Sequence, residues 1–372
     1  MRKNWIARML RLIFSVTTIA ICILFIIGCL LPWISAKTFW IGGLIGLIFP
    51  YITLSLILII FCWLFINKKI TYFLIFLIFI GYKQIKTICA ININETFTPT
   101  KSQNNIRIIS WNIAYLSGKP LYTTDQQHSE VDVISSIFKQ NADIICLQEF
   151  QECNNGCKGL DLIKRKYPYY YLSSWDHKYS EVGSIGAIFS KYPIIKKESK
   201  RFKNGEAVLR ADIEIHMDTI SIFTTHLESF RFSKEEFKKI DIANASDNLN
   251  KKNTRGILSK LKNKLKVHSD EAKIVADFIQ LTNYPLIFSG DLNEVANNHT
   301  YWAIRGNKQD AFLEKGFGFG KTYNSLKNNL RIDYIMPDTN FVVTQFNIVD
   351  DNLSDHKMLV SDVVLKKYQT KK

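Results

Sequence analysis

Two long uncharged stretches dominate the first quarter of the chain. Twenty-five residues without a charge separate Arg11 from Lys37, and thirty separate Lys37 from Lys68. At about 1.5 Å of rise per helical residue, each stretch can cross a hydrocarbon core of about 30 Å. The pattern therefore predicts transmembrane helices at 12–36 and 39–66. A cleaved signal peptide would have a shorter apolar core and would not be followed so closely by a second long span.

A third apolar segment is shorter and less regular. Ile70–Tyr82 is apolar, but Lys83, Gln84 and Lys86 then interrupt it. A helix over 70–93 is long enough to cross if the lysines snorkel or face the bundle. The alternative is two spans followed by a helix that lies in the membrane interface. We thus expect an anchor over residues 1–93 with two to three transmembrane helices.

The basic residues predict how this anchor is oriented. They cluster before the first span and between the second and third, whereas the first loop contains only Lys37. The positive-inside rule then places the N-terminus in the cytoplasm. With three spans, the rest of the chain lies on the other side. We expect an integral membrane protein of a bacterial inner membrane, held in the lipid bilayer by its N-terminal helices, with an extracytoplasmic C-terminal domain.

The polar segment 94–105 reads as a linker, and 106–368 reads as a folded domain. Apolar or alternating runs suited to strands recur along this domain, and helical patterns lie between several of them. Ser269 is the predicted N-cap of a helix over Glu271–Leu281. Strands without regular βαβ alternation favour an α/β (α+β) layered sandwich over a doubly wound sheet or a barrel. The predicted strands are Ile106–Trp111, Ile144–Leu147, Ser184–Phe189, Val208–Ile215, Thr219–Thr225, Pro285–Ser289, Ile332–Met336, Phe341–Phe346 and Met358–Leu365.

Charge and cysteine content add little. Nine basic residues and no acidic ones precede Glu95, so the net charge of +15 falls to +6 for the rest, which is a weak argument for nucleic acid. Cys153 and Cys157 are close enough to form a small disulfide loop in an oxidising compartment, and two unpaired thiols are the alternative. A zinc site is disfavoured because no second Cys/His pair stands at ligand spacing.

Six segments place polar or ionisable groups at the ends of apolar strands. An Asp or Asn after a strand is usually a turn residue, so each segment alone is a weak signal. A Glu is a poorer turn former, which makes Glu149 the strongest single candidate. The segments are Ser110-Trp111-Asn112, Leu147-Gln148-Glu149, Thr224-Thr225-His226, Ser289-Gly290-Asp291-Leu292-Asn293, Arg331-Ile332-Asp333-Tyr334 and Ser354-Asp355-His356.

Taken in order, and with the intervening stretch Gly186–Pro193, these motifs resemble those of the endonuclease/exonuclease/phosphatase family over nearly the whole region after the linker. The resemblance implies a four-layered α/β/β/α sandwich, preceded here by the transmembrane helices. It also implies an active site where the strand ends converge, and hydrolysis of a phosphoester with a divalent cation.

The resemblance further implies a metal shell made of oxygen ligands, which suit Mg²⁺, with Mn²⁺ as the alternative. Glu149 would be the principal ligand, Asn112 would contact the metal shell or the phosphate, and Asp355 would join them.

The remaining motif residues would carry the chemistry. By the same resemblance, Asp291 would activate the attacking water and Asn293 would hold Asp291 and a phosphate oxygen. His356, oriented by Asp333, would donate to the phosphate, and His226 would act near the leaving group or donate to the phosphate.

The expected function is a membrane-anchored phosphodiesterase or nuclease. A phospholipid phosphodiesterase of the sphingomyelinase-like kind or a phosphatase is the alternative, followed by an inactive membrane scaffold. Either way the expected substrate is a phosphoester, nucleic acid or phospholipid, and no obligate protein partner is evident.

Three features remain outside these motifs. Gly316–Thr322 approaches a phosphate-binding loop, but its glycine spacing is one residue short and no long helix follows, so a structural turn is expected. An insertion over 230–267 contains Lys251–Lys266, with seven basic and no acidic residues. It reads as a solvated helix, a membrane contact or a substrate rim. The histidines without a motif read as surface or core residues: His128, His177, His216, His268 and His299.

Overall fold

The computed structural model describes residues 2–93, 95–114, 130–150, 158–173, 185–230, 251–324 and 330–368. Cys153 and Cys157, His128 and His177 lie outside these residues.

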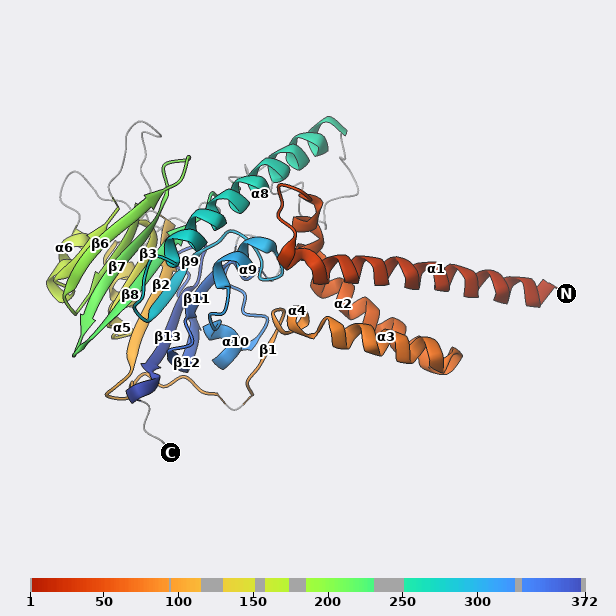
Figure 1. Cartoon of the computed structure of the whole chain (residues 1–372), viewed down its shortest axis with the longest axis horizontal. Coiled ribbons are helices and arrows are strands. Elements are labelled where there is room, and N and C mark those ends of the chain that lie inside the picture. The colour runs from red at the N-terminus through yellow and green to blue at the C-terminus, as the bar shows by residue number, and fades with distance from the viewer. Residues whose placement is uncertain are drawn as a thin grey trace.

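Two twisted sheets form the centre of the C-terminal domain (Figure 1). One sheet has six strands in the order β12-β13-β2-β3-β5-β4, and the other has five in the order β11-β9-β8-β7-β6. Among the strands of the described residues, only β2/β3 and β8/β9 pair in parallel. The strands of the first sheet are β12 (Phe341–Val349), β13 (Met358–Leu365), β2 (Ile106–Asn112), β3 (Ile144–Phe150), β5 (Ile185–Ser190) and β4 (Tyr169–Leu172). Those of the second are β11 (Asp333–Pro337), β9 (Leu286–Asp291), β8 (Asp218–His226), β7 (Ala207–Ile215) and β6 (Ile194–Arg201).

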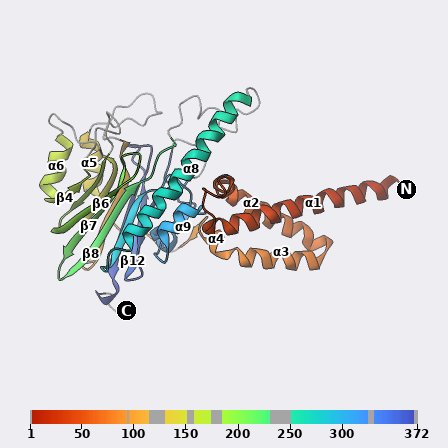
Figure 2. The ribbon, with the colours of Figure 1, turned by 45° about the horizontal axis from the view of Figure 1, so that its top comes forward.

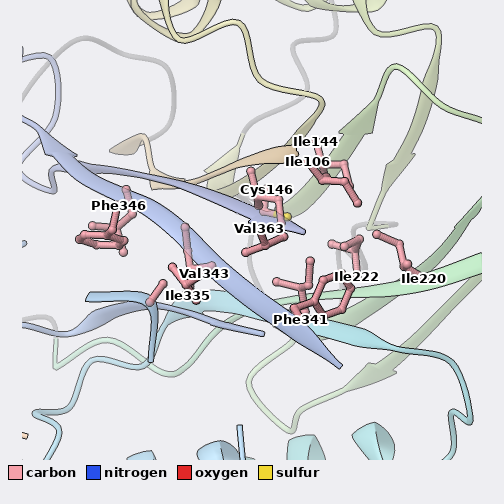
Figure 3. Close-up of a cluster of buried hydrophobic side chains, with 14 of the residues drawn as sticks. Ile106, Ile144, Cys146, Ile220, Ile222, Ile335, Phe341, Val343, Phe346 and Val363 are labelled. Atoms are coloured by element: carbon pink, nitrogen blue, oxygen red, sulfur yellow. The ribbon is translucent and has the colours of Figure 1, made fainter. Parts of the chain in front are cut away.

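The sheets face each other across an aliphatic core. Ile144 and Cys146 of the first sheet are fully buried in the same cluster as Ile222 and Ile335 of the second (Figure 3). Strands that are buried on both faces appear in the sequence as continuous apolar runs, because neither face contacts water. Burial raises the pKa of the Cys146 thiol to about 12, so this cysteine behaves as a small apolar core residue.

Helices cover both outer faces. On the six-stranded sheet, α5 (Glu130–Lys139) and α6 (Lys158–Lys166) bury Ile137 and Ile163. On the other sheet, α8 (Lys251–Ile279) and α9 (His299–Arg305) pack around Phe223 and Phe288. The expected four-layered sandwich is therefore confirmed.

The N-terminal helices project from one side of this sandwich (Figures 1 and 2). They are α1 (Arg2–Leu30), the 3₁₀ turn η1 (Leu31–Trp33), α2 (Ile41–Ile66), α3 (Lys68–Ile80) and α4 (Tyr82–Lys86). By length and composition, α1 and α2 can each cross a membrane. Asn67 ends α2 and caps α3, since its side-chain oxygen accepts from the backbone N–H of Lys69 at 3.0 Å.

The third apolar segment differs from the continuous helix expected over 70–93. The helix breaks at Gly81, whose φ of −79° and ψ of 4° depart from the helix. An added Cβ there would lie 2.5 Å from the ring of Phe25 in α1, so glycine allows this close contact. The chain then forms α4 and the short strand β1 (Ala90–Ile91), which pairs with β10 (Phe317–Gly318) of the domain. The segment after α2 therefore leads the chain back from the far end of α2 to the sandwich.

Residues 94–105, expected to be a linker, are partly tied to the domain. Arg107 donates from its guanidinium to the carbonyl oxygens of Thr98 and Pro99, and Thr98 also contacts Gln345. Upstream of this segment, Asn92 donates to two backbone carbonyls around α10 (Ala311–Lys315). The N-terminal helices are thus joined to the domain by a segment that is hydrogen-bonded to it.

The helix expected to begin after Ser269 is instead the C-terminal part of α8, which runs unbroken from Lys251. Ser269 is not an N-cap: its hydroxyl donates to Leu265 O within the helix and accepts from the backbone N–H of Ala36 in the α1–α2 loop. Lys37 of that loop also pairs with Asp270. The second half of the predicted insertion is therefore a helix that contacts the N-terminal helices.

Candidate active site

Topology brings the polar strand ends together at one end of the sandwich. The parallel pairs β2/β3 and β8/β9 end there, at Asn112, Glu149, His226 and Asp291. Antiparallel strands begin where their partners end, so β11 starts with Asp333 directly opposite Asp291. The segment before β13 enters from the same end, because β13 runs antiparallel to β2.

Asp291 lies at the centre of this cluster and is fully buried. One carboxylate oxygen, Oδ2, accepts from the side-chain amide of Asn112 at 3.1 Å, and the other accepts from the backbone N–H of Asn293 at 2.8 Å. The same Oδ2 lies 3.6 Å from Nε2 of His356 and 3.7 Å from Nε2 of His226. The carboxylate is held in one orientation between two imidazoles.

His356 is oriented by a buried carboxylate. Its Nδ1 lies 3.0 Å from Asp333 Oδ2, which leaves Nε2 directed to Asp291. Burial lowers the pKa of His356, but Asp333 and Asp291 outweigh it and raise the pKa well above its ordinary value. Thr322 in turn accepts from the backbone N–H of Asp333. The imidazole is therefore a positioned donor.

His226 approaches Asp291 from the other side. Its Nε2 is 3.1 Å from the side-chain nitrogen of Asn293 and 3.5 Å from Glu149, while Nδ1 is 3.5 Å from Glu206. Burial alone would lower its pKa, but Glu206, Glu149 and Asp291 outweigh burial and raise the pKa to about 10. Glu206 precedes the buried strand β7 and had no strand-end signal by which the sequence could have identified it.

Glu149 occupies a strained backbone position at the mouth of the cluster. Its φ of 50° lies in the left-handed region, where a residue with a side chain costs about 1–3 kcal/mol, and the pairing of β3 with β5 is irregular between Leu147 and Phe150. Burial raises the pKa of its carboxyl, Asp355 adds to the rise, and His226 and His356 oppose it. Such strain is typical of functional positions.

Comparison with known protein families agrees with this arrangement of residues. The model of the Endonuclease/Exonuclease/phosphatase family matches residues 109–356. The chain belongs to this family. Residues 10–88 match a second family, described as a domain of unknown function (DUF8431). No curated protein matches the chain.

Solved structures of the family share the fold. An endonuclease/exonuclease/phosphatase from Beutenbergia cavernae is 15% identical, with a TM-score of 0.50 over 71% of this chain and 72% of that one. The catalytic domain of human Nocturnin, solved with a bound sulfate anion, is 17% identical, with a TM-score of 0.50 over 72% of this chain and 97% of that one. At these identities the likeness concerns the fold alone.

Enzymes of this family hydrolyse phosphoester bonds and typically require a divalent metal. Among the described residues, two groups of side chains offer ligands for a metal. Asp291, Asp333 and His356 place ligand atoms within 4.8 Å of one another. In this group, however, His356 already pairs with Asp333 at 3.0 Å and lies 3.6 Å from Asp291. Its ligand atom is also an imidazole nitrogen, which Mg²⁺ does not favour. Glu149, with Asp355 near enough to raise its pKa, offers oxygen ligands at the mouth and fits a hard cation better.

A tight backbone contact fixes the strand end that carries Asp291. Gly290 has φ +150°, and a Cβ added there would lie 2.2 Å from the carbonyl oxygen of Thr225 on the neighbouring strand. Only glycine fits, so this residue sets the spacing between the ends of β8 and β9.

Behind the site lies a buried network that the motifs did not reveal. His268 of α8, expected to be an ordinary surface or core histidine, directs Nδ1 to Glu294 Oε1 at 2.8 Å and Nε2 to the backbone oxygen of Glu228 at 2.5 Å. Glu271 accepts from the backbone N–H of Glu228 at 2.9 Å, and Lys264 pairs with the Glu228 side chain. Glu228 and Glu294 lie two and three residues beyond His226 and Asp291, so the network joins α8 to both strand ends.

The glycine-rich stretch expected to be a structural turn is not followed by a helix within the described residues. It contains the short strand β10, and the hydroxyl of Thr322 accepts from the backbone N–H groups of Ile332 and Asp333. The stretch therefore supports the strand that carries Asp333.

Proposed function

We propose that this chain is a membrane-anchored, Mg²⁺-dependent phosphodiester hydrolase. The observation that carries the proposal is the set of contacts around Asp291: two amide donors fix its carboxylate, and two histidines with raised pKa lie within 3.7 Å of one oxygen. Asp291 can therefore act as the base that takes a proton from water, and the two histidines beside it can donate to phosphate oxygens.

Each residue of the site then has a separate role in the reaction. Glu149, with Asn112 and Asp355, would hold the cation, which neutralises charge on the phosphate oxygens. Asp291 accepts a proton from the attacking water as the new oxygen–phosphorus bond forms.

The two histidines complete the step. His356, held by Asp333, donates to the phosphate oxygen that gains charge. His226 donates a proton to the leaving oxygen as the ester bond breaks, and the backbone N–H of Asn293 holds the Asp291 carboxylate in place. Proton transfers by positioned groups contribute roughly 10²–10⁴-fold each to the rate.

The arrangement of the N-terminal helices supports anchoring with the enzyme on the side opposite the N-terminus. The sandwich contacts the α1–α2 loop through Ser269 and Asp270. The basic clusters at the start of α1 and at Lys68 and Lys69 lie at the other ends of the helices. If α2 spans the membrane, the segment from α3 to β1 must cross back, because β1 pairs with the sandwich.

A phospholipid phosphodiesterase is the second candidate. The observation that favours it is the direct contact between α8 and the anchor, where Leu265 lies against Gly43 in the first turn of α2. If α2 spans a membrane, this contact would hold the catalytic domain next to the membrane surface.

The test is a substrate screen with the full-length chain in detergent micelles, since truncation at residue 100 would remove β1. DNA, RNA, phospholipid vesicles and a soluble phosphomonoester are each incubated with Mg²⁺ or with EDTA. We expect metal-dependent cleavage of a phosphodiester. Cleavage of phospholipid alone would select the second candidate, and no cleavage of any substrate would support an inactive scaffold.

A further inference from the structure

The small sheet β1/β10 presents a patch of apolar side chains to solvent. Ile91 and Phe317 are direct cross-strand partners, and their exposed fractions are 76% and 68%. Ile93 follows the end of β1 and Phe319 follows the end of β10, and they are 76% and 52% exposed. These four residues are called the apolar rim below.

The pattern of the rim is built into the sequence. Phe317 and Phe319 alternate in the sequence with Gly316, Gly318 and Gly320, and both phenylalanines are exposed. Gly318 has φ +80°, and at Gly320 a Cβ would lie 2.6 Å from the Phe312 ring. The backbone conformation thus favours glycine at 318 and close packing favours glycine at 320, whereas the two exposed phenylalanines contribute nothing to the core. Asn92, between the two isoleucines, turns to the domain instead.

The position of the rim can be measured along α2. Lys68 and Lys69 follow Asn67 just beyond the far end of this helix, and the twenty residues needed to cross about 30 Å of hydrocarbon run back from Ile66 to Leu47. Leu47 and Phe319 line the same cavity between α2 and the domain. If α2 spans a bilayer, Phe319 of the rim therefore lies at the depth where the hydrocarbon meets the headgroups.

Side chains on the neighbouring segments have the composition of a membrane interface. Trp33, just after α1, is 72% exposed, and Tyr82, at the start of α4, is 62% exposed. Exposed Lys83 and Lys86 stand beside Tyr82 on α4. Tryptophan and tyrosine are enriched at headgroup level, and lysines there extend their charges into water.

We propose that the apolar rim docks the catalytic domain onto the bilayer that its own N-terminal helices span. The proposal rests on the anchoring proposed above. The docked rim supplies a second attachment besides the helices, and it fixes the orientation of the active site relative to the membrane surface.

The test uses the full-length chain in phosphatidylcholine vesicles that contain a lipid with a photoactivatable diazirine high on its acyl chain. After irradiation, labelled peptides are identified by mass spectrometry. We expect labelling of the rim and of lipid-facing residues of α2 such as Leu54. Met217, which is 94% exposed on the β7–β8 turn, is the matched apolar control and should stay unlabelled.

A double variant, Phe317→Ser with Phe319→Ser, should reduce labelling around Ile91 about tenfold, the scale for withdrawing a large apolar side chain from hydrocarbon. Met217→Ser should change nothing. Unchanged thermal unfolding in detergent shows that the double variant folds, and the single variant Phe317→Ser serves if it does not.

Each outcome decides the proposal. Labelling of α2 without the rim overturns docking but leaves the anchor and the proposed hydrolase standing. Labelling of neither overturns both docking and anchoring. Chemical cross-links from the rim to a second copy of the chain would show that the rim is a protein interface, which also overturns the proposal.

Discussion

Glu271 offers a quantitative test of the buried network behind the active site. Its carboxyl is almost fully buried, and its pKa is raised from 4.5 to about 7, because burial and the nearby Glu228 outweigh the effect of His268. The folded state therefore holds this proton to a higher pH than the unfolded state does. The resulting stability is fully present below pH of about 4.5 and is lost as pH rises to about 7.

The magnitude follows from the shift. A difference of this size corresponds to about 3 kcal/mol, at about 1.4 kcal/mol for each pKa unit. Glu271→Gln mimics the protonated form and has no such pH dependence. We expect the melting temperature of the variant, relative to wild type, to rise by about 6–12 °C between pH 4.5 and 8, at roughly 2–4 °C for each kcal/mol in a domain of this size.

The assay is thermal unfolding of both full-length proteins in one detergent at several pH values. Other carboxylates titrate in both proteins, so their contributions cancel in the difference. A difference in melting temperature that stays constant across this pH range would refute the reasoning, since it would mean that the Glu271 carboxyl is not shifted.

Three further predictions concern the backbone, the basic helix and the topology. Gly290→Ala should lower the melting temperature by several degrees and reduce turnover, because its Cβ would collide with the Thr225 carbonyl; wild-type unfolding curves would contradict this. Replacing three lysines of α8 with Gln should raise KM for anionic polymers or bilayers and weaken its salt dependence, while kcat on a small soluble phosphodiester stays unchanged. The three lysines are Lys260, Lys262 and Lys266. If KM depends on salt in the same way in wild type and variant, these lysines do not attract the substrate. A reporter fused after Lys372 should behave as extracytoplasmic, and cytoplasmic activity would contradict three crossings.

Lys264 is kept out of that set because it pairs with Glu228 in the buried network. The sequence alone grouped it with the other lysines of the helix. Its replacement would disturb the active-site support and the surface charge together, so a change in KM could not be attributed to steering.

The central strands and the residues at their ends could be predicted because burial on both faces leaves a continuous apolar run that ends abruptly. The edge strand β6 could not. Its sequence, Ile194–Arg201, is mostly charged and exposed, as befits an edge strand protected from pairing by lysines, so it carries no apolar signal.

The parts that sequence reasoning missed depend on contacts distant in sequence. Ser269 has the local pattern of an N-cap, but its hydroxyl accepts from the backbone N–H of Ala36 in the α1–α2 loop. His268 has no motif around it, because its partners Glu228 and Glu294 lie just beyond the ends of two different strands, β8 and β9. Glu206 reaches His226 only after β7 and β8 have paired.

The most direct test of the account is Mg²⁺-dependent phosphodiester hydrolysis by three full-length variants. Glu149→Gln and Asp291→Asn remove the two carboxylates assigned to the cation and to the water. Glu214→Gln makes the same kind of change at an exposed position at the opposite end of β7. We predict losses of at least about 100-fold for the first two, with unfolding curves like wild type, and full activity for the third. Near-normal hydrolysis by Glu149→Gln or Asp291→Asn would contradict the assignment of this site.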